Sequence, residues 1–434
     1  MKKFQILGAA LAVAAFACAD IAPEPEVTNV TMTQDDTRRV TIGYTLAHAP
    51  AVVTIDVQTN ATDGTWASIG GENIQRVAGD VNKVVEGDGA HAITWMPHLS
   101  WPGHKITDNG ARVVLTAWSL DDTPDYMVLD LASDSTARVA YFPNAGQLPG
   151  GILSNKAYRT THMVMRRIPA ANVTWTMGSV GEPGREKDET PHAVTLDRDY
   201  YMAVFPTTQA QWDYLVPATN RAAKSTRGPL RPMNYVSYND ARNSSIEQYN
   251  ANNNGSYGYP KGPHASSYIG RMRKLSGLAD FGIDLPSEAQ WEFAARAGHG
   301  DGFWGDGTLI RTDSTNTDFE GVPGNIRSTG VVDCGLYPPN DWGLYDTVGN
   351  VLEWCLDYYE ADITGLGGAV NADGEQTATG NAPASSFQRV RRSLSYSDTY
   401  AWHRSRIAHR ARPADQNDRS YGCGFRLMCY GTLK

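Results

Sequence analysis

The chain has 434 residues, of which 41% are hydrophobic and 20% are charged, and its formal net charge is −9. This length favours two or three domains, and the apolar content suffices for packed cores, which excludes wholesale disorder. The acidic balance, with no basic run in the sequence, argues against nucleic-acid binding, which needs clustered Lys and Arg.

Residues 1–19 have the composition of an export signal. Lys2 and Lys3 form a charged start, residues 6–16 an apolar stretch, and Ala15 to Ala17 a small-residue cleavage pattern. The apolar stretch is too short to span a bilayer, and no other segment has a composition that could cross one. We therefore predict an exported protein (periplasmic, surface-bound or extracellular) without a transmembrane segment. Cys18 leaves open the alternative of a lipoprotein anchored by acylation.

Residues 20–143 are rich in short β-strand patterns. "RRVTIGYTL", "AVVTIDVQT" and "ARVVLTAWSL" cluster β-branched residues, and turns such as Asp63-Gly64 separate them. Short strands at this spacing predict an all-β sandwich of the immunoglobulin type. The segment carries no cluster of titratable groups, which favours a spacer or adhesion module. Residues 144–170, which contain "NAGQLPGG", are predicted to be a connector.

Residues 171–432 form the expected second domain, in which irregular, aromatic-rich and glycine-rich stretches outnumber regular elements. A first helix is expected to begin at Thr207 in "TTQAQWDYLV". Its Thr-x-x-Ala start and the apolar residues on one face carry that prediction.

The segment "PSEAQWEFAARAG" predicts a second helix more firmly, because its ends are marked. Ser287 can cap the amino end, and Gln290 completes a capping box. Glu292 and Arg296 are four residues apart and can pair on the helix surface. Gly298 marks the carboxyl end.

Four segments in order resemble one known family. They are "TWTMGSVGEPGREKDETPHAVTLDRDYYMAVFPTTQAQW" (174–212), "LPSEAQWEFAARAG" (285–298), "NDWGLYDTVGNVLEWCLDYY" (340–359) and "RVRRSLSY…RIAHRARP…GFRL" (389–427). Together they resemble the formylglycine-generating enzyme family, also called sulfatase-modifying factor. The resemblance implies an irregular α+β fold related to C-type lectins, which agrees with the many turns and few helices expected here.

The resemblance also implies calcium, which hard oxygen ligands in a loop would hold. The matching positions are Val348, Gly349, Asn350 and Glu353. A second family site matches Asn325, but Asp333 is the only carboxylate near it. The alternative is that Asn350 and Glu353 only bond the backbone.

Enzymes of this family hold two cysteines that bind Cu(I) and oxidise a sulfatase cysteine to formylglycine with O₂. The family pattern places these cysteines at or beside Ser397 and Trp402, where this chain has no Cys. The scattered histidines do not form the triad of iron-dependent relatives. We therefore expect neither copper nor iron.

Four cysteines remain beyond the export signal. They are Cys334, Cys355, Cys423 and Cys429. In an oxidising compartment an even set predicts one or two disulfides, with three pairings open if all four join. No spacing typical of a zinc site is present in the sequence.

The segment from Ser393 to Pro413 carries the binding hypothesis, because Tyr, Ser, Trp and Arg are the usual residues of binding loops. The candidate ligand-binding residues are Ser395, Tyr396, Ser397, Asp398, Tyr400, Trp402, His403 and Arg404. A protein, peptide or glycan ligand is expected. Two alternatives stay open. One is an oxidase whose metal ligands are unidentified. The other is a structural surface protein in which the β-sandwich, and not the second domain, binds the ligand. A refinement of the binding hypothesis is that the C-terminal segment is hypervariable.

The resemblance finally implies structural anchors. The aromatic residues expected in the core are Trp291, Phe293, Trp342, Tyr345 and Trp354. Arg410 and Arg426 are expected to pair with carboxylates among Glu288, Glu292 and Asp346.

Overall fold

The computed structural model describes most of residues 23–431. Outside the described residues lie 1–22, 61–62, 106–109, 134–137, 183, 217–225, 243–262, 276, 301–323, 327, 364–387, 399–401 and 432–434. The predicted export signal, Cys18 and Tyr400 are among them. Within the described residues no helix is long and apolar enough to cross a membrane.

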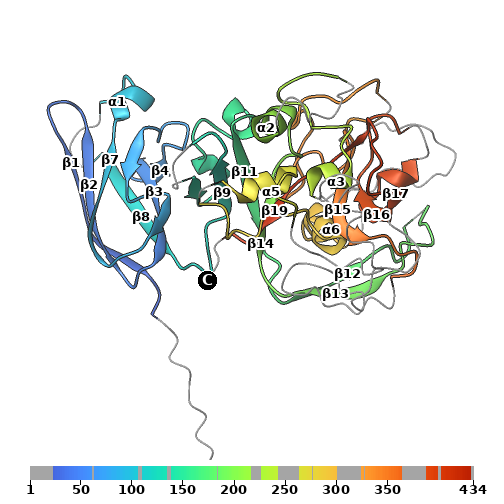
Figure 1. Cartoon of the computed structure of the whole chain (residues 1–434). Helices are drawn as coiled ribbons and strands as arrows, with labels where there is room; N and C mark the ends of the chain where they lie inside the picture. The colour runs from blue at the N-terminus through green and yellow to red at the C-terminus, as the bar shows by residue number, and fades with distance from the viewer. Residues whose placement is uncertain are drawn as a thin grey trace, which may run out of the picture.

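The amino-terminal unit consists of two antiparallel sheets (Figure 1). One sheet contains, in spatial order, β1 (Glu26–Gln34), β2 (Val40–Ala47), β7 (Gly89–Trp95) and β5 (Val77–Gly79). The other contains β4 (Trp66–Ser68), β3 (Ala51–Asn60) and β6 (Lys83–Val85), with β8 (Ala111–Trp118) also paired to β3. A short helix, α1 (Pro97–Ser100), follows β7.

The core of this unit lies between the two sheets, because one face of each strand is apolar. Val40, Ile42 and Tyr44 alternate with more exposed residues on β2, and they pack in one cluster with Val53 and Ile55 of β3. This alternation is the pattern from which a sandwich was predicted, and a two-sheet unit is what the structure shows.

The second unit is organised around a five-stranded sheet. Its strands, in spatial order, are β10 (Val139–Phe142), β9 (Tyr126–Asp130), β11 (His162–Ile168), β14 (Tyr200–Ala203) and β19 (Met428–Cys429). The first two fall within residues 20–143, the range expected for the sandwich. They nevertheless pair with one another and, through β9, with β11. The second unit therefore extends upstream of the predicted connector at 144–170.

The remaining elements of the second unit are short. Two smaller sheets contain β12 (Val173–Met177) with β13 (His192–Leu196), and β17 (Ala411–Asp415), β16 (Gln388–Arg392), β15 (Leu352–Tyr358) and β18 (Cys423–Gly424). The helices among the described residues are α2 (Gln209–Leu215), α3 (Tyr238–Ala241), α5 (Tyr268–Arg273) and α6 (Glu288–Arg296), with 3₁₀ turns η1 (Ala145–Gln147), η2 (Lys156–Arg159) and η4 (Trp402–Ser405). The predicted irregular architecture with few helices is confirmed.

Helix α6 follows its sequence signals. The Ser287 hydroxyl accepts from the Gln290 backbone at 3.1 Å, and the Gln290 side chain accepts from the Ser287 backbone at 2.9 Å, which closes the predicted capping box. The helix ends at Arg296, and Ala297 and Gly298 both have left-handed backbones. The first predicted helix begins later than expected, because Thr208 and not Thr207 is its cap.

The aromatic anchors are mostly where the resemblance puts them. Trp291, Phe293, Tyr345 and Trp354 are buried. Trp342 is less buried than the other four and packs against the outside of a core cluster.

The disulfide prediction is wrong for this structure, in which all four described cysteines are free and buried. They are divided among separate core clusters. Cys334 lies in one, Cys355 in another, and Cys423 with Cys429 in a third. Each thiol thus serves as a small apolar side chain.

Candidate functional site

A buried ion-pair network joins helix α6 to the C-terminal segment. Glu288 accepts from Arg392 Nη1 at 2.9 Å and from Arg410 Nε at 2.6 Å. Glu292 accepts from Arg392 Nη2 at 2.6 Å and from Arg296 Nη2 at 2.7 Å. Burial alone would raise the pKa of both glutamates, but the guanidinium groups hold each pKa below its ordinary value. The predicted partners of Arg296 and Arg410 are confirmed.

The partner of Arg426 differs from the expected ones. Its guanidinium donates to the two oxygens of Glu353 at 2.6 and 2.8 Å. Glu288 and Glu292 are already engaged by other arginines, and Asp346 offers Arg426 only its backbone carbonyl, at 3.3 Å. Both members of the pair are fully buried.

A third buried pair fixes the loop between β12 and β13 to the C-terminal segment. Arg406 donates to Glu182 Oε2 at 3.0 Å and to Glu189 Oε1 at 2.6 Å, and it also reaches the carbonyl of Gly184. These two glutamates lie more than 200 positions before Arg406 in the chain. The loop and the segment therefore form one surface.

A pocket of about 460 Å³ opens on this surface. Its lining residues are Glu186, Asp188, Tyr359, Arg404, His409, Arg410, Arg412 and Pro413. Two carboxylates thus face three guanidinium groups, an imidazole and a phenol. A pocket with both signs of charge suits a ligand that also carries both.

The charged pairs in this pocket are looser than those beneath it. Arg404 Nε lies 3.6 Å from Glu186, and His409 Nε2 lies 3.9 Å from the same carboxylate. The Tyr359 hydroxyl donates to Asp188 at 2.7 Å. Burial and the Asp188 carboxylate raise the pKa of Tyr359 to about 12, so this phenol stays a neutral donor. Loose pairs can exchange partners with a ligand at little cost.

The predicted binding residues are only partly brought together. Ser395 and Tyr396 are buried, and Ser395 joins Ser397 (Oγ to Oγ, 2.9 Å) and Asp398, whose carboxylate accepts from the Ser395 backbone at 2.8 Å. These residues form a turn. Arg404 lines the pocket. Tyr400 and the side chains of Trp402 and His403 lie outside the described residues.

Of the other pocket residues, His409, Arg410, Arg412 and Pro413 lie in the predicted binding segment but were not named individually as ligand-binding. Glu186 and Asp188 belong to "GREKDETPH", whose alternating charges were the available signal. Tyr359 ends a family segment, and Arg410 was expected only as an anchor. Their approach to Arg412 depends on contacts between distant parts of the chain.

The expected calcium ligands have other partners here. The Glu353 carboxylate, already bound to Arg426, also accepts from Trp291 Nε1 at 2.7 Å. Asn350 Oδ1 accepts from the Val332 backbone at 3.1 Å and from Asn325 Nδ2 at 3.2 Å. Ca²⁺ takes six to eight oxygen ligands, and the side-chain oxygens of Glu353 and Asn350 are already hydrogen-bonded to protein groups here.

The backbone of the expected calcium loop is packed against its neighbour. A side chain on Gly324 would come within 2.1 Å of the Val348 carbonyl oxygen, and one on Gly349 within 2.8 Å of the Asn325 carbonyl oxygen. The two expected sites are thus one hydrogen-bonded loop pair. Across the described part of the chain, no group of three or more His, Cys, Asp or Glu side chains is placed to hold a metal.

Comparison with known proteins covers the second unit. Residues 153–429 match the sulfatase-modifying factor enzyme 1-like domain. The formylglycine-generating enzyme of Bos taurus is 24% identical over 295 residues, which cover 61% of this chain and 74% of that protein. The inactive Cα-formylglycine-generating enzyme 2 of Bos taurus is 38% identical over 109 residues, 23% of this chain and 35% of that protein. PvdO from Pseudomonas aeruginosa has a TM-score of 0.45 at 24% identity, covering 62% of this chain and 94% of that one.

Proposed function

The chain belongs to the sulfatase-modifying factor enzyme 1-like family, and on that premise we propose that it is an exported binding module rather than a copper oxidase. Its ligand is a peptide or protein segment that carries charges of both signs. The observation that carries this proposal is the C-terminal pocket, in which Glu186 and Asp188 face Arg404, Arg410 and Arg412.

The difference between the ion pairs beneath the pocket and those at its surface supports a binding role. Arginines beneath the pocket, such as Arg392 and Arg406, are held by carboxylates at 2.6 to 3.0 Å. At the pocket Arg404 lies 3.6 Å from Glu186 in an exposed pair, whereas Arg410 is buried and held from beneath by Glu288 at 2.6 Å. The scaffold is therefore rigid, while the groups at its surface can bind a charged segment.

The raised pKa values of the thiols are the reason that the proposal includes no copper chemistry. Burial raises the pKa of Cys423 to about 11 and that of Cys429 to about 12, and it raises the pKa of Cys334 and Cys355 well above the ordinary value. Cu(I) is bound by thiolates, and thiols with raised pKa values are protonated at neutral pH. None of these cysteines is among the residues that line the pocket.

Calcium is not needed to account for the stability of the loops. In the proposed module the Glu353–Arg426 pair holds the position that the resemblance gives to a calcium ligand. Addition of a chelator should therefore leave the melting temperature unchanged. A clear fall in the melting temperature, restored by calcium, would contradict this assignment.

Peptide binding tests the proposal directly. Four fluorescent hexapeptides, composed of alternating Lys and Glu, of Lys alone, of Glu alone, and of Gly and Ser, would be titrated by anisotropy. The alternating peptide should bind tightest, and Arg412→Glu should weaken it by about tenfold because charge complementarity is lost. Arg412 is exposed, so the fold should survive. Arg76→Glu, at an exposed arginine of the sandwich, is the matched control.

Two results would overturn the proposal. One is equal binding of the alternating peptide by Arg412→Glu and wild type. The other is near-stoichiometric copper in the purified protein, with oxygen uptake on addition of a cysteine peptide. That second result would establish the oxidase alternative.

A further inference from the structure

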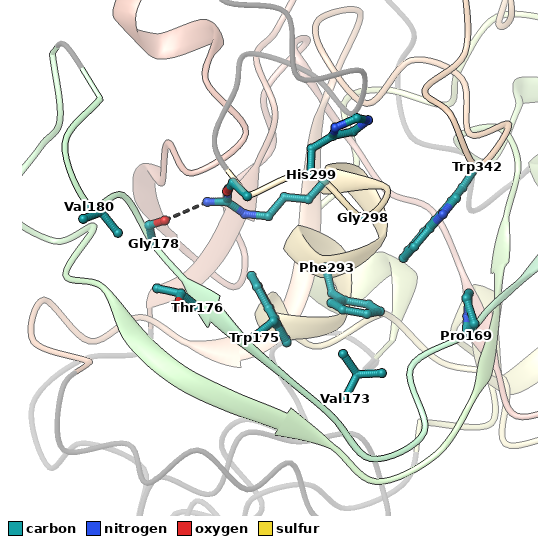
Figure 2. A pocket seen from close by; sticks show the side chains of 12 residues that line it. Pro169, Val173, Trp175, Thr176, Gly178, Val180, Phe293, Gly298, His299 and Trp342 are labelled. Carbon is teal, nitrogen blue, oxygen red and sulfur yellow. Dashed lines mark hydrogen bonds between the residues drawn. The ribbon is translucent and has the colours of Figure 1, made fainter.

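A second pocket, of about 480 Å³, lies beside the carboxyl end of α6 (Figure 2). Its lining residues are Pro169, Val173, Trp175, Thr176, Gly178, Val180, Phe293, Arg296, Gly298, His299, Gly300 and Trp342. None of them lines the C-terminal pocket, so an inference from this site goes beyond the proposed function.

Three aromatic rings form one wall of this pocket. Phe293 lies between the two indoles, with its centroid 5.4 Å from that of Trp175 and 5.4 Å from that of Trp342. The rings are tilted by 53° and 60°, so they line a concave surface and do not stack on one another. Figure 2 shows Val173 and Pro169 on the side of the same space away from His299. The wall is thus apolar and rigid.

The charges at the pocket are already neutralised. Arg296 is bound to Glu292 at 2.7 Å, to the Gly178 carbonyl at 2.7 Å and to the Gly300 carbonyl. His299 Nε2 lies 2.8 Å from an Asp341 carboxylate oxygen. Among the described lining residues, an anion would find no unengaged guanidinium. A cation would meet Arg296, whose Cζ lies 5.9 Å from the Trp175 ring centroid.

The apolar surface continues beyond the pocket. Val180, at the rim, is 66% exposed, and Val173 is also exposed. A ligand confined to the cavity would leave these side chains in water, whereas a macromolecular partner would cover them. Exposed apolar surface around an aromatic pocket is typical of a site that takes an anchoring side chain from a protein.

We propose that this pocket binds an uncharged aromatic side chain of a protein partner, with apolar neighbours of that side chain covering Val173 and Val180. The cavity, of about 480 Å³, has room for an aromatic side chain. The occupant is thus a Phe, Tyr or Trp in an apolar segment, unlike the charged segment assigned to the C-terminal pocket.

Small aromatic probes test the pocket itself. Benzyl alcohol, benzylammonium and benzoate share one ring and differ in charge, and ligand-observed NMR would measure their binding to the full chain. Thr176→Trp places an indole in the pocket from an exposed strand position without removing a core side chain. Thr33→Trp, at an exposed threonine of β1, is the matched control. Benzyl alcohol should bind wild type and Thr33→Trp, and about tenfold weaker to Thr176→Trp.

A peptide tests the protein partner. The peptide Ala-Val-Phe-Val-Ala should bind wild type, and Val180→Ser should weaken it severalfold while leaving benzyl alcohol unaffected. Failure of wild type to bind benzyl alcohol, binding unchanged in Thr176→Trp, or tighter binding of either charged probe would overturn the pocket assignment. Equal peptide binding by Val180→Ser and wild type would overturn the assignment to a protein partner. Charged hexapeptide binding is measured separately, so failure here leaves the C-terminal pocket unaffected.

Discussion

Substitution of Arg392 by Met is expected to destabilise the protein more than any surface change. Arg392 is fully buried and makes three hydrogen bonds, to Glu288 at 2.9 Å, to Glu292 at 2.6 Å and to the Ile407 carbonyl at 2.7 Å. A buried hydrogen bond to a charged group contributes about 1.5–3 kcal/mol, and removal of one partner of a buried ion pair costs about 3–5 kcal/mol.

The cost of one lost partner is a better expectation for Arg392→Met than a sum over all three hydrogen bonds, because both glutamates keep a second arginine. Arg410 stays on Glu288, and Arg296 stays on Glu292. We therefore expect a loss of about 3–5 kcal/mol in the free energy of unfolding. Arg392→Lys keeps the charge without the planar fork and should recover only part of the loss.

Urea unfolding followed by circular dichroism measures these differences. The control is Arg419→Met, which removes a pair with Asp240 whose side chains are 49% and 21% exposed. That variant should lose about 1 kcal/mol or less, as exposed pairs do. If Arg392→Met and Arg419→Met cost the same, the network does not hold the C-terminal segment as argued.

Three other kinds of buried group carry further expectations. Burial and the Glu288 carboxylate raise the pKa of Asp357 from 3.8 to about 7, so its contribution to stability is lost as pH rises through that range. Asp357→Asn should therefore exceed wild type in urea unfolding by on the order of 2 kcal/mol at pH 8 but not at pH 4, and equal differences would contradict this. Trp354→Ala should lose about 3–5 kcal/mol, because the ring is fully buried and its Nε1 donates to the Val236 carbonyl at 3.0 Å; a loss below about 1 kcal/mol would refute its core position. The four described cysteines should resist iodoacetamide in the native protein and react in urea, and peptide mass spectrometry that found native labelling would contradict their burial.

Local signals explain which parts of the fold could be predicted. The capping box of α6 and its Glu292–Arg296 pair involve residues three and four apart, so short-range rules suffice. Strand β9 was not singled out among the strand patterns of residues 20–143, and its pairing with β11 could not be derived from local signals. The domain boundary was therefore placed after strands that belong to the second unit.

Long-range contacts explain what could not be predicted at the site. Tyr359 meets Asp188 across 171 positions, and Arg410 meets Glu288 across 122. Nothing in either neighbourhood specifies such a partner. The family resemblance supplied Arg410, because its motif includes that position. It did not supply the pocket, because Glu186 and Asp188 were read only as part of a matching segment.

The arrangement of ion pairs has a consequence for how the binding surface is built. Arg392 and Arg406 are both buried and both bound to glutamates of other segments, so they fix the two ends of the stretch between them. Stability therefore depends on the ends, because loss of Arg406 would break its buried pairs with Glu182 and Glu189, and loss of Arg392 would leave one arginine on each of its two glutamates. Within the stretch Leu394, Tyr396 and Ser405 are buried, whereas Arg404 at the pocket lies 3.6 Å from Glu186 in an exposed pair. Arg404, whose ion pair is exposed, can be exchanged at little cost in folding, whereas Arg392 and Arg406 cannot, so ligand preference can change at the pocket while the scaffold is kept.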